Sequence, residues 1–527
     1  MTSWRKRATT AVALAAVVSL ALAACSSGDS GSADTAPAAT DSASAPAAAG
    51  QPLPDDQQNL TYVINWGCSL LDTTANFNNC SMQVISNVMQ GLVALDPETH
   101  EPKPLLAESW TWLDPTTLQF KLRDDVTFSD GTPFTANDVV ASFDRYIAMK
   151  SVLGAQLAVV SSYTADDPTT FTLHTANPTG TLLGIVSMIF IGQEARAADD
   201  AYWAQPIGTG PFVIDEFVAN DHISLSRNDA YWGEKAKLKT LTFKQVDDIN
   251  SRITALANGE VQVVAGVPND QIPTVEGMDG ITFSQVPSLT YNFLWFQNSR
   301  EPFTDKNVRL AMWMALDMPT IVSSLLGETA STMSSLCPEV AFGCLPSDKT
   351  PSYDPEGAKK LLAEAGYPNG FSASVDFNQA NAGNDQLVAA MISYWKEIGV
   401  TVTAKTDDTA AFNEAIASPG NFDMIVNPNL NATGDADFTL NRLYTCKANR
   451  LGYCNEALDA LLSQAQQETD SAKRLAIYQE VSDLLATDAP AIGLYQSSIN
   501  VAASDSVQGL TLIPSENYDW STVYLAE

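Results

Sequence analysis

Basic side chains are scarce in this sequence of 527 residues. It has 28 lysines and arginines against 61 aspartates and glutamates, which gives a formal net charge of −33 at pH 7. A chain of this charge repels phosphate groups and anionic lipid headgroups, because binding to either depends on clusters of lysine and arginine. We therefore expect no nucleic acid among its partners and no attachment to a membrane through a basic patch.

Metal-binding and hydrolytic motifs are also absent from the sequence. There are three histidines, and the cysteine spacings differ from the tight pairs of zinc ribbons. The sequence contains no Gly-x-Ser-x-Gly, no His-Glu-x-x-His and no Gly-x4-Gly-Lys motif. We expect no metal, no cofactor and no enzymatic activity. Carboxylate pairs of the kind that glycosidases use leave a secreted hydrolase as an alternative.

A basic segment and then an apolar segment open the chain. Residues 5–7 are Arg-Lys-Arg, and residues 11–24 are mainly alanine, valine and leucine. This pattern predicts an export signal, because the apolar run is shorter than the roughly 20 residues that cross a bilayer. Cys25 follows directly, so residues 22–25 resemble the lipobox of bacterial lipoproteins. The resemblance implies cleavage before Cys25, lipid on this residue and a place at the outer face of the bacterial cytoplasmic membrane. An ordinary cleaved signal is the alternative.

The cysteine count fits an oxidising compartment. Seven cysteines are present, and an even six remain if Cys25 carries lipid. Outside the reducing cytosol such a set predicts disulfides. Their short spacings favour three local pairs among the possible pairings: Cys68 with Cys80, Cys337 with Cys344, and Cys446 with Cys454.

The composition changes near residue 60. Residues 25–59 are rich in serine, alanine, glycine, proline and aspartate, which predicts a disordered linker, because so few apolar side chains cannot form a core. Strand and helix patterns then interleave. Apolar residues alternate over 118–122, and a capping box at Thr135 and Asp138 opens a helix. Asp354, Asn455 and Asp470 open further helices. Interleaved strands and helices over this length favour an α/β fold.

Two long blocks of sequence resemble a known family. The first runs over residues 107–135 and includes Phe-Ser-Asp-Gly-Thr-Pro at 128–133; the second covers residues 206–212 and 227–233. Both are similar to the peptide/nickel/opine family of extracytoplasmic solute-binding proteins that serve ABC importers. Further similarity at 291–316, 358–367 and 475–495 extends the resemblance over nearly all of residues 60–527.

The resemblance implies a bilobal periplasmic-binding-protein fold of the α/β class, with mixed sheets, an inserted subdomain and a ligand cleft between the lobes. It also implies a monomer that docks on an ABC permease and ATPase complex. The expected divisions are a signal peptide at 1–24, a lipid-anchored linker at 25–59, lobe I at 60–97, 205–290 and 500–527, the inserted subdomain at 98–204, and lobe II at 291–499.

Candidate binding residues follow from the same resemblance. In peptide-binding members, an aspartate after a strand holds the amino group of the peptide. The corresponding strand here is 422–426. An alignment without a gap puts Ala432 at that position, whereas a short gap puts Asp435 there. The remaining candidates lie in the turn after it and on segments that line the cleft in relatives: Asp437, Tyr291, Asn292, Trp295, Trp66, Tyr495 and Trp520.

The expected function is capture of a peptide or peptide-like solute outside the cell membrane and its delivery to an ABC permease. The departure at Ala432 leaves two alternatives open. One is a non-peptide solute such as an oligosaccharide, a siderophore or an opine, and the other is an envelope sensor or chaperone with the same cleft. Nickel is not expected, because His100, His174 and His222 fall in a turn and two strands of the scaffold.

Overall fold

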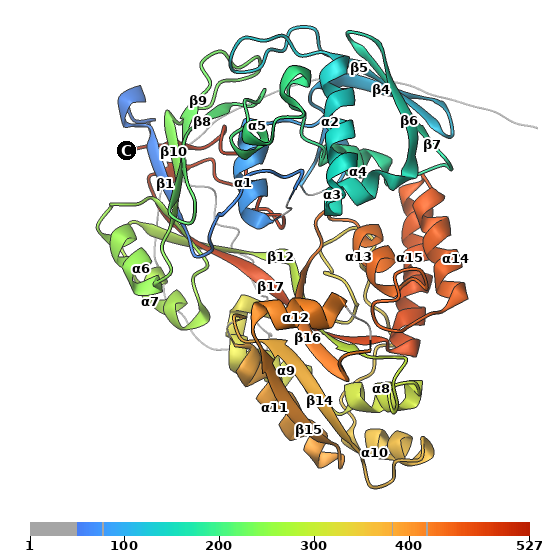
Figure 1. Ribbon diagram of the computed structural model, residues 1–527. Coiled ribbons are helices and arrows are strands. Elements are labelled where there is room, and N and C mark those ends of the chain that lie inside the picture. Colours follow the sequence, from blue (N-terminus) through green and yellow to red (C-terminus); the bar gives the residue numbers. More distant parts are fainter. Residues whose placement is uncertain (1–49, 76–77, 98, 382, 418–419) are drawn as a thin grey trace, which may run out of the picture. The chain divides into compact units, whose positions relative to one another are not determined.

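The computed structural model describes residues 50–75, 78–97, 99–381, 383–417 and 420–527 (Figure 1). The predicted signal peptide, Cys25 and the linker up to residue 49 lie outside the described residues. Residues 50–58, which the sequence places in the linker, contact the end of the chain. Leu53 N–H donates to the Leu525 carbonyl at 2.8 Å, and Pro52 forms a β-bridge with Ala526.

One mixed sheet of 11 strands runs through this part of the chain. In spatial order its strands are β15 (Thr401–Asp407), β14 (Ser372–Asn378), β16 (Met424–Leu430), β12 (Ile281–Phe296), β17 (Ala491–Ser504), β11 (Val263–Ala265), β1 (Asn59–Ile64), β10 (Thr240–Gln245), β9 (His222–Arg227) and β8 (Phe212–Val218), with β13 (Ala330–Thr332) paired to β17. The two longest strands, β12 and β17, pair antiparallel from Ile281 with Ser504 to Trp295 with Ala491. They connect the two halves of the sheet.

Two large hydrophobic cores include residues from opposite ends of this strand pair. The first draws on residues between 60 and 265 and between 499 and 525, and the second on residues between 289 and 494. Each contains fully buried tryptophans, Trp203 and Trp520 in the first and Trp295 and Trp395 in the second. The described residues therefore form two lobes of mixed α/β structure, as expected. The expected limits of the lobes and of the inserted subdomain stay a prediction.

A second, four-stranded antiparallel sheet belongs to the first core. Its order is β4 (Ala107–Asp114), β5 (Thr117–Leu122), β7 (Thr170–Thr175) and β6 (Val160–Asp167). Phe120 and Phe171 from this sheet pack with Phe143 of α2 (Ala136–Met149). The predicted capping box is confirmed at the start of α2, where Thr135 N–H donates to Asp138 Oδ2 at 2.7 Å.

Helices cover both lobes (Figure 1). The helices of the first lobe are α1 (Asn79–Val88), α3 (Val152–Gln156), α4 (Leu182–Ser187), α5 (Asp200–Ala204), α6 (Ile249–Ala257) and α7 (Ile272–Glu276). Those of the second are α8 (Lys306–Met314), α9 (Met318–Leu326), α10 (Pro355–Glu364), α11 (Asn384–Glu397), α12 (Thr409–Ala417), α13 (Ala436–Tyr444), α14 (Glu456–Gln467) and α15 (Ser471–Asp488). Asp354, Asn455 and Asp470 cap α10, α14 and α15 as predicted. Short strands complete the fold: β2 (Val93–Leu95), β3 (Pro102–Pro104), β18 (Val507–Gln508) and β19 (Tyr524–Leu525).

None of the helices in the described residues is, by itself, both long and apolar enough to cross a membrane. A bent pair, Lys306–Met314 with Met318–Thr329, meets the criterion only when its two parts are taken together.

The glycines of the second family block bring two elements into contact. A Cβ on Gly208 would lie 1.9 Å from the Val88 carbonyl oxygen at the end of α1, and Gly210 N–H donates to the same oxygen at 2.8 Å. Glycine is required here because the backbone approaches too closely for a side chain. This contact fixes α1, which forms one wall of the cleft described below, against the start of β8.

The three predicted disulfides are present. Cys68 pairs with Cys80, Cys337 with Cys344, and Cys446 with Cys454. Each closes a short loop, as the spacing predicts.

Candidate functional site

Two adjoining cavities, each of about 240 Å³, lie between segments of the first core and segments of the second. We call them chamber A and chamber B. They share Leu95, His100, Thr433 and Gly434. A third cavity of about 10 Å³ adjoins chamber B and is lined by Leu430, Asn431 and Ala432. Together these cavities form a cleft large enough for a small solute.

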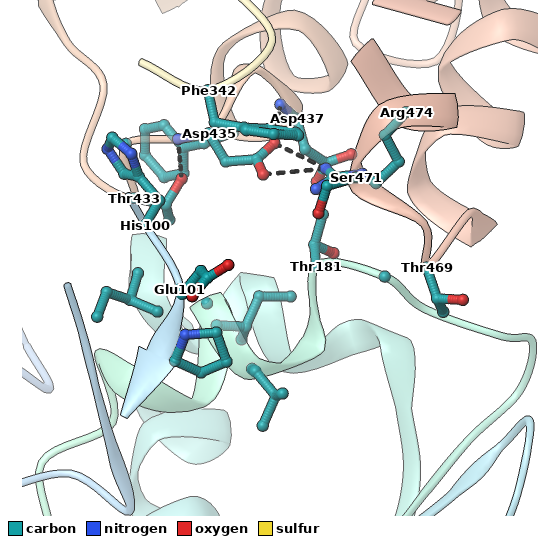
Figure 2. Close-up of a pocket in the computed structure, with 18 of the residues that line it drawn as sticks. His100, Glu101, Thr181, Phe342, Thr433, Asp435, Asp437, Thr469, Ser471 and Arg474 are labelled. Carbon is teal, nitrogen blue, oxygen red and sulfur yellow. Dashed lines mark hydrogen bonds and ion pairs between the residues drawn. The ribbon is translucent and has the colours of Figure 1, made fainter. Parts of the chain in front are cut away.

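Chamber A holds most of the charged side chains of the cleft (Figure 2). His100, Glu101 and Thr181 come from the first lobe and face Asp435, Ser471 and Arg474 on the second. Thr181 Oγ1 is buried and has no hydrogen-bond partner among the described residues. Of the four charged side chains that line this chamber, three are carboxylates, those of Glu101, Asp435 and Asp437. Chamber A therefore suits a solute that brings hydrogen-bond donors or positive charge.

Chamber B is lined by one charged side chain, that of Asp96. Its walls include the flexible side chains of Met82, Met89 and Met188, together with Phe190 and Ile513. Methionine adapts to irregular shapes because its side chain is unbranched and polarisable. This chamber can accept an apolar group of variable shape.

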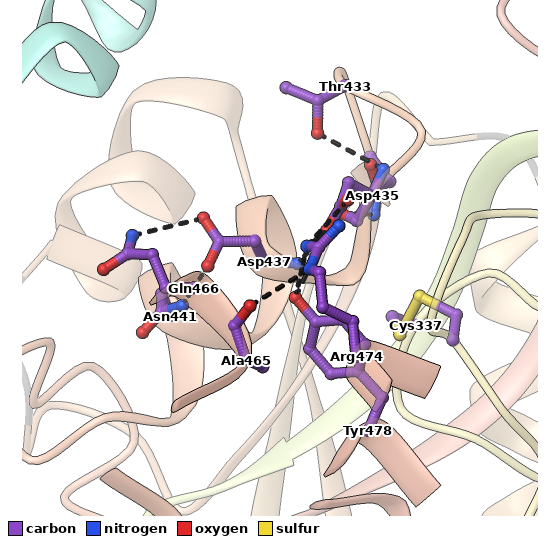
Figure 3. A network of polar contacts seen from close by, with 11 residues as sticks. Cys337, Thr433, Asp435, Asp437, Asn441, Ala465, Gln466, Arg474 and Tyr478 are labelled. Carbon is purple, nitrogen blue, oxygen red and sulfur yellow. Dashed lines mark hydrogen bonds and ion pairs between the residues drawn. A yellow bond between two sulfur atoms is a disulfide. The ribbon is translucent and has the colours of Figure 1, made fainter. Parts of the chain in front are cut away.

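Asp435 is held in a buried ion pair (Figure 3). Its carboxylate oxygens accept from Arg474 Nη2 at 2.9 and 3.0 Å, and Oδ1 also accepts from Tyr478 Oη at 3.2 Å. Asp435 is also the N-cap of α13, because Oδ1 accepts from Asp437 N–H at 2.9 Å. Burial alone would lower the pKa of Arg474, but the Asp435 carboxylate holds this pKa above its usual range. The Arg474 guanidinium fixes Asp435 in the wall of chamber A.

The loop closed by Cys337 and Cys344 supports the same network. Its Phe342 lines chamber A and lies over the Arg474 guanidinium, 4.9 Å from ring centroid to carbon. Phe342 N–H donates to the Gly434 carbonyl, and Ala436 N–H donates to the Phe342 carbonyl, both at 2.8 Å. The disulfide-closed loop therefore braces the turn that carries Asp435.

Asp437 is the most buried carboxylate of the cleft. It is 6% exposed, and its oxygens accept from Asn441 Nδ2 at 2.6 Å and from Gln466 Nε2 at 3.5 Å. Burial and then the nearby charge of Asp435 raise the pKa of Asp437 to about 7. The Asp437 carboxyl group in the wall of chamber A therefore gains or loses a proton near neutral pH.

The raised pKa predicts a pH effect on stability. Because the folded pKa lies above the unfolded value of 3.8, the folded chain holds a proton on Asp437 at pH values where the unfolded chain has lost it. The free energy of unfolding should therefore fall from about pH 4 to pH 7, by up to about 1.4 kcal/mol per pH unit for this group. Asp437→Asn should flatten this slope in urea unfolding measured across the window.

Glu516→Gln is a second variant for this measurement, because burial also raises the pKa of Glu516 to about 7 at a site outside the Asp435 network. The two variants should each remove part of the slope. A slope in Asp437→Asn equal to that of the parent chain would contradict the prediction.

The structure separates the sequence-predicted site residues into two groups. Asp435 and Asp437 line chamber A. The other six do not line chamber A or chamber B. Tyr291, Trp295 and Trp520 are 0–1% exposed in the cores, and Asn292 pairs with Tyr495 between β12 and β17. Tyr495 lines a separate cavity of about 40 Å³, and Trp66 is half-buried against the first core. A solute contact by these six stays a prediction.

His100, Glu101, Thr181, Phe342 and Arg474 line the cleft but were not among the candidates. His100 lies in a turn with φ of 58°, and a Cβ on Gly434 would come within 3.0 Å of its ring. Burial lowers the pKa of His100 below its usual value, although Asp435 and Asp96 oppose the shift. Of these five residues, only Phe342 lies in a segment that the sequence singles out, because the spacing of Cys337 and Cys344 predicts a disulfide-closed loop around it.

Comparison with known proteins agrees with this architecture. Residues 101–450 match the family described as "Bacterial extracellular solute-binding proteins, family 5 Middle". The glutathione-binding protein GsiB of Escherichia coli strain K12 is 27% identical over 482 residues, which cover 88% of this chain and 94% of that protein.

Two solved structures show the same fold. DppA from Helicobacter pylori, in complex with the peptide STSA, has a TM-score of 0.76 and 23% identity over 90% of this chain and 99% of that chain. AgaA from A. tumefaciens R10, in complex with agropinic acid, has a TM-score of 0.76 and 25% identity over 89% and 99%.

Proposed function

The chain belongs to family 5 of the bacterial extracellular solute-binding proteins, and we propose that it is a lipid-anchored receptor for a peptide or peptide-like solute. In this proposal the receptor encloses the solute between its two lobes and delivers it to an ABC permease. It carries out no chemistry on the solute.

The observation that carries the proposal is the pair of adjoining chambers between the lobes, one lined by four charged side chains and the other by a single charged side chain and flexible apolar ones. A short peptide offers both kinds of surface, since its backbone and charged ends are polar and its side chains can be apolar. The ligands of relatives support a peptide or peptide-like solute: GsiB is described as binding glutathione, and DppA is seen with a tetrapeptide. AgaA holds agropinic acid, so an opine is the alternative solute.

Chamber A is the place for the amino group of the solute. Arg474 neutralises Asp435, whereas Glu101 forms no ion pair with another described residue. An ammonium group in this chamber would gain charge-assisted hydrogen bonds from carboxylates. Asp435 can still accept further bonds, because an ionised carboxylate offers about four lone-pair sites.

The lipid anchor is supported by the lipobox-like residues 22–25. The mass of the N-terminal peptide of the mature protein tests it. A free amino terminus at Cys25 without added lipid mass would contradict the anchor.

A thermal-shift screen of the purified full-length chain tests the solute class. Pools of free di- to pentapeptides, their N-acetylated forms, glutathione and agropinic acid would be compared. A ligand at 100 times its dissociation constant stabilises the fold by about 2.7 kcal/mol, which is readily seen as a higher melting temperature. A shift with free peptides that is lost on acetylation is expected. A shift with agropinic acid alone would establish the opine alternative, and no shift with any peptide or with glutathione would contradict the proposal.

A further inference from the structure

His100 lies at the junction of the two chambers. Of the four described residues that line both chambers, it is the only one whose side chain can gain a proton near neutral pH. It comes from the first lobe, between β2 and β3, and its ring reaches the second lobe, where a Cβ on Gly434 would lie 3.0 Å from both Cδ2 and Nε2. Figure 2 shows the ring beside the turn that carries Thr433 and Asp435. The charge of this imidazole therefore acts on both lobes and on any solute in the cleft.

The His100 imidazole makes no hydrogen bond and no ion pair with another residue that the structure describes. The two carboxylates whose charges act on it are those of Asp435 and Asp96. Asp435 Oδ1 is already paired with Arg474 Nη2 at 2.9 Å. Asp96 Oδ2 is already paired with Lys103 Nζ at 2.5 Å. A proton on His100 would therefore add a third cation beside two complete ion pairs, in a half-buried position.

The other charged groups of chamber A are Glu101 and Asp437. Glu101 follows His100 in the chain and is exposed. Burial and then the charge of Asp435 raise the pKa of Asp437 to about 7, so this group loses its charge as the pH falls below neutral. The described segments of the first lobe that line the rest of the chamber, around β4, α3 and α4, carry no charged side chain there. A fall in pH thus removes a negative charge at Asp437 and adds a positive charge at His100, and both changes oppose an ammonium group.

Closing of the cleft is coupled to the proton of His100. Burial in this arrangement lowers the pKa of His100 below its usual value of 6.5, although Asp435 and Asp96 oppose the shift. Opening the cleft moves the ring away from Gly434 toward water, where its pKa returns toward the usual value. Between these two pKa values the closed chain holds fewer protons than the open chain, so closing releases a proton. By linkage, a fall in pH through this window favours the open chain.

We propose that His100 is a specificity-determining residue that lets the cleft hold an ammonium-bearing solute at neutral pH and makes it release that solute at acidic pH. In its neutral form the ring packs against Gly434 and adds no charge to the chamber. In its protonated form the imidazolium repels the ammonium group of the solute, because like charges in one site disfavour each other and the neighbouring carboxylates are already paired. This assignment rests on the proposed function and adds its regulation by pH.

The first test needs no solute. The sequence has three histidines, so their Cε1–H resonances can be followed by NMR against pH in the histidine-labelled full-length chain. The His100 resonance is identified by its loss in His100→Asn, because asparagine does not titrate and tolerates the φ of 58° at this position. We expect the pKa of His100 to lie below 6.5, and that of His222, which is hydrogen-bonded to Asp221 at 2.7 Å, to lie above 6.5. A pKa of His100 at or above 6.5 would overturn the proposal.

The second test is the affinity for free peptides, measured by calorimetry at about pH 7.5 and about pH 5. Between these conditions the parent chain should lose about tenfold more affinity than His100→Asn, since a pKa difference of one unit corresponds to a tenfold change. The loss that remains in His100→Asn comes from Asp437. His222→Gln is the matched control, because His222 gains a proton in the same pH range but lines neither chamber, and it should keep the pH profile of the parent.

The two proposals fail in different ways. Peptide binding with the same pH profile in the parent chain and in His100→Asn would overturn the role of His100 and leave the proposed function in place. A lowered pKa of His100 without binding of any free peptide at about pH 7.5 would count against the proposed function alone.

Discussion

Arg474→Gln should lower the free energy of unfolding by about 3–5 kcal/mol, because it leaves the Asp435 carboxylate in a largely buried wall without its partner. The side chains of Arg474 and Asp435 are 8% and 20% exposed, so solvent screens the pair only weakly. The substitution also removes the hydrogen bond from Arg474 to the Ala465 carbonyl and the cation that Phe342 covers. Urea unfolding of the full-length chain measures this effect.

Lys349→Gln is the control, since Lys349 is 58% exposed and pairs with Asp483. Its effect should stay within about 1 kcal/mol, as is usual for exposed ion pairs. Asp435→Asn in the Arg474→Gln background should be less harmful than the two single effects added together, because the two residues interact directly. A parent-like stability for Arg474→Gln would refute the role given to this pair.

Gly180→Ala should keep the cleft from closing. Gly180 lies between β7 and α4 of the first lobe, and its N–H donates to the Gln466 carbonyl of the second at 2.7 Å. A Cβ on this residue would lie 2.0 Å from the Glu468 carbonyl oxygen, a backbone atom that cannot move aside alone. Because Gly180 lines chamber A, separating the two segments opens the chamber to water. We expect at least about tenfold weaker binding, equivalent to 1.4 kcal/mol, of the peptide that gives the largest thermal shift.

Gly184→Ala is the matched control for this effect. Gly184 also lines chamber A, on α4, but a Cβ there would meet no atom within 4 Å. Small-angle scattering with peptide present should show compaction for the parent chain and for Gly184→Ala, and none for Gly180→Ala. Equal compaction and affinity in all three proteins would show that the Gly180 contact does not hold the lobes together.

Local patterns predicted local structure well in this chain. The alternation over 118–122, the capping box at Thr135 and the caps at Asp354, Asn455 and Asp470 all depend on residues a few positions apart. The disulfides share this property, since their partners are 7 to 12 residues apart. In these cases the sequence contains both partners of the interaction within one short segment.

The cleft depends on partners that are distant in the sequence. The resemblance to the family pointed to Asp435. Its ion pair with Arg474, 39 residues later, cannot be predicted from the sequence, because nothing near either residue identifies its partner. The aromatic candidates on the segments that line the cleft in relatives could belong either to a core or to a cleft wall. The sequence does not separate these two roles, because both surfaces are rich in aromatic residues. Tyr291 illustrates this: it is fully buried, and its hydroxyl accepts a hydrogen bond from Asn429 Nδ2 at 3.1 Å. Gly208 signals a special backbone position, while its reason, the contact with Val88, appears only in three dimensions.

Native mass spectrometry of the full-length chain, mixed with free tripeptides, their N-acetylated forms or glutathione, tests most directly whether the cleft holds a peptide-like solute. One free tripeptide per chain should remain bound, and the modified peptides should dissociate. If the mass of the chain shows no bound ligand with any peptide or with glutathione, the chain is not a receptor that binds a peptide-like solute in the cleft between its lobes. Cleavage of the peptides into fragments would contradict this account as well.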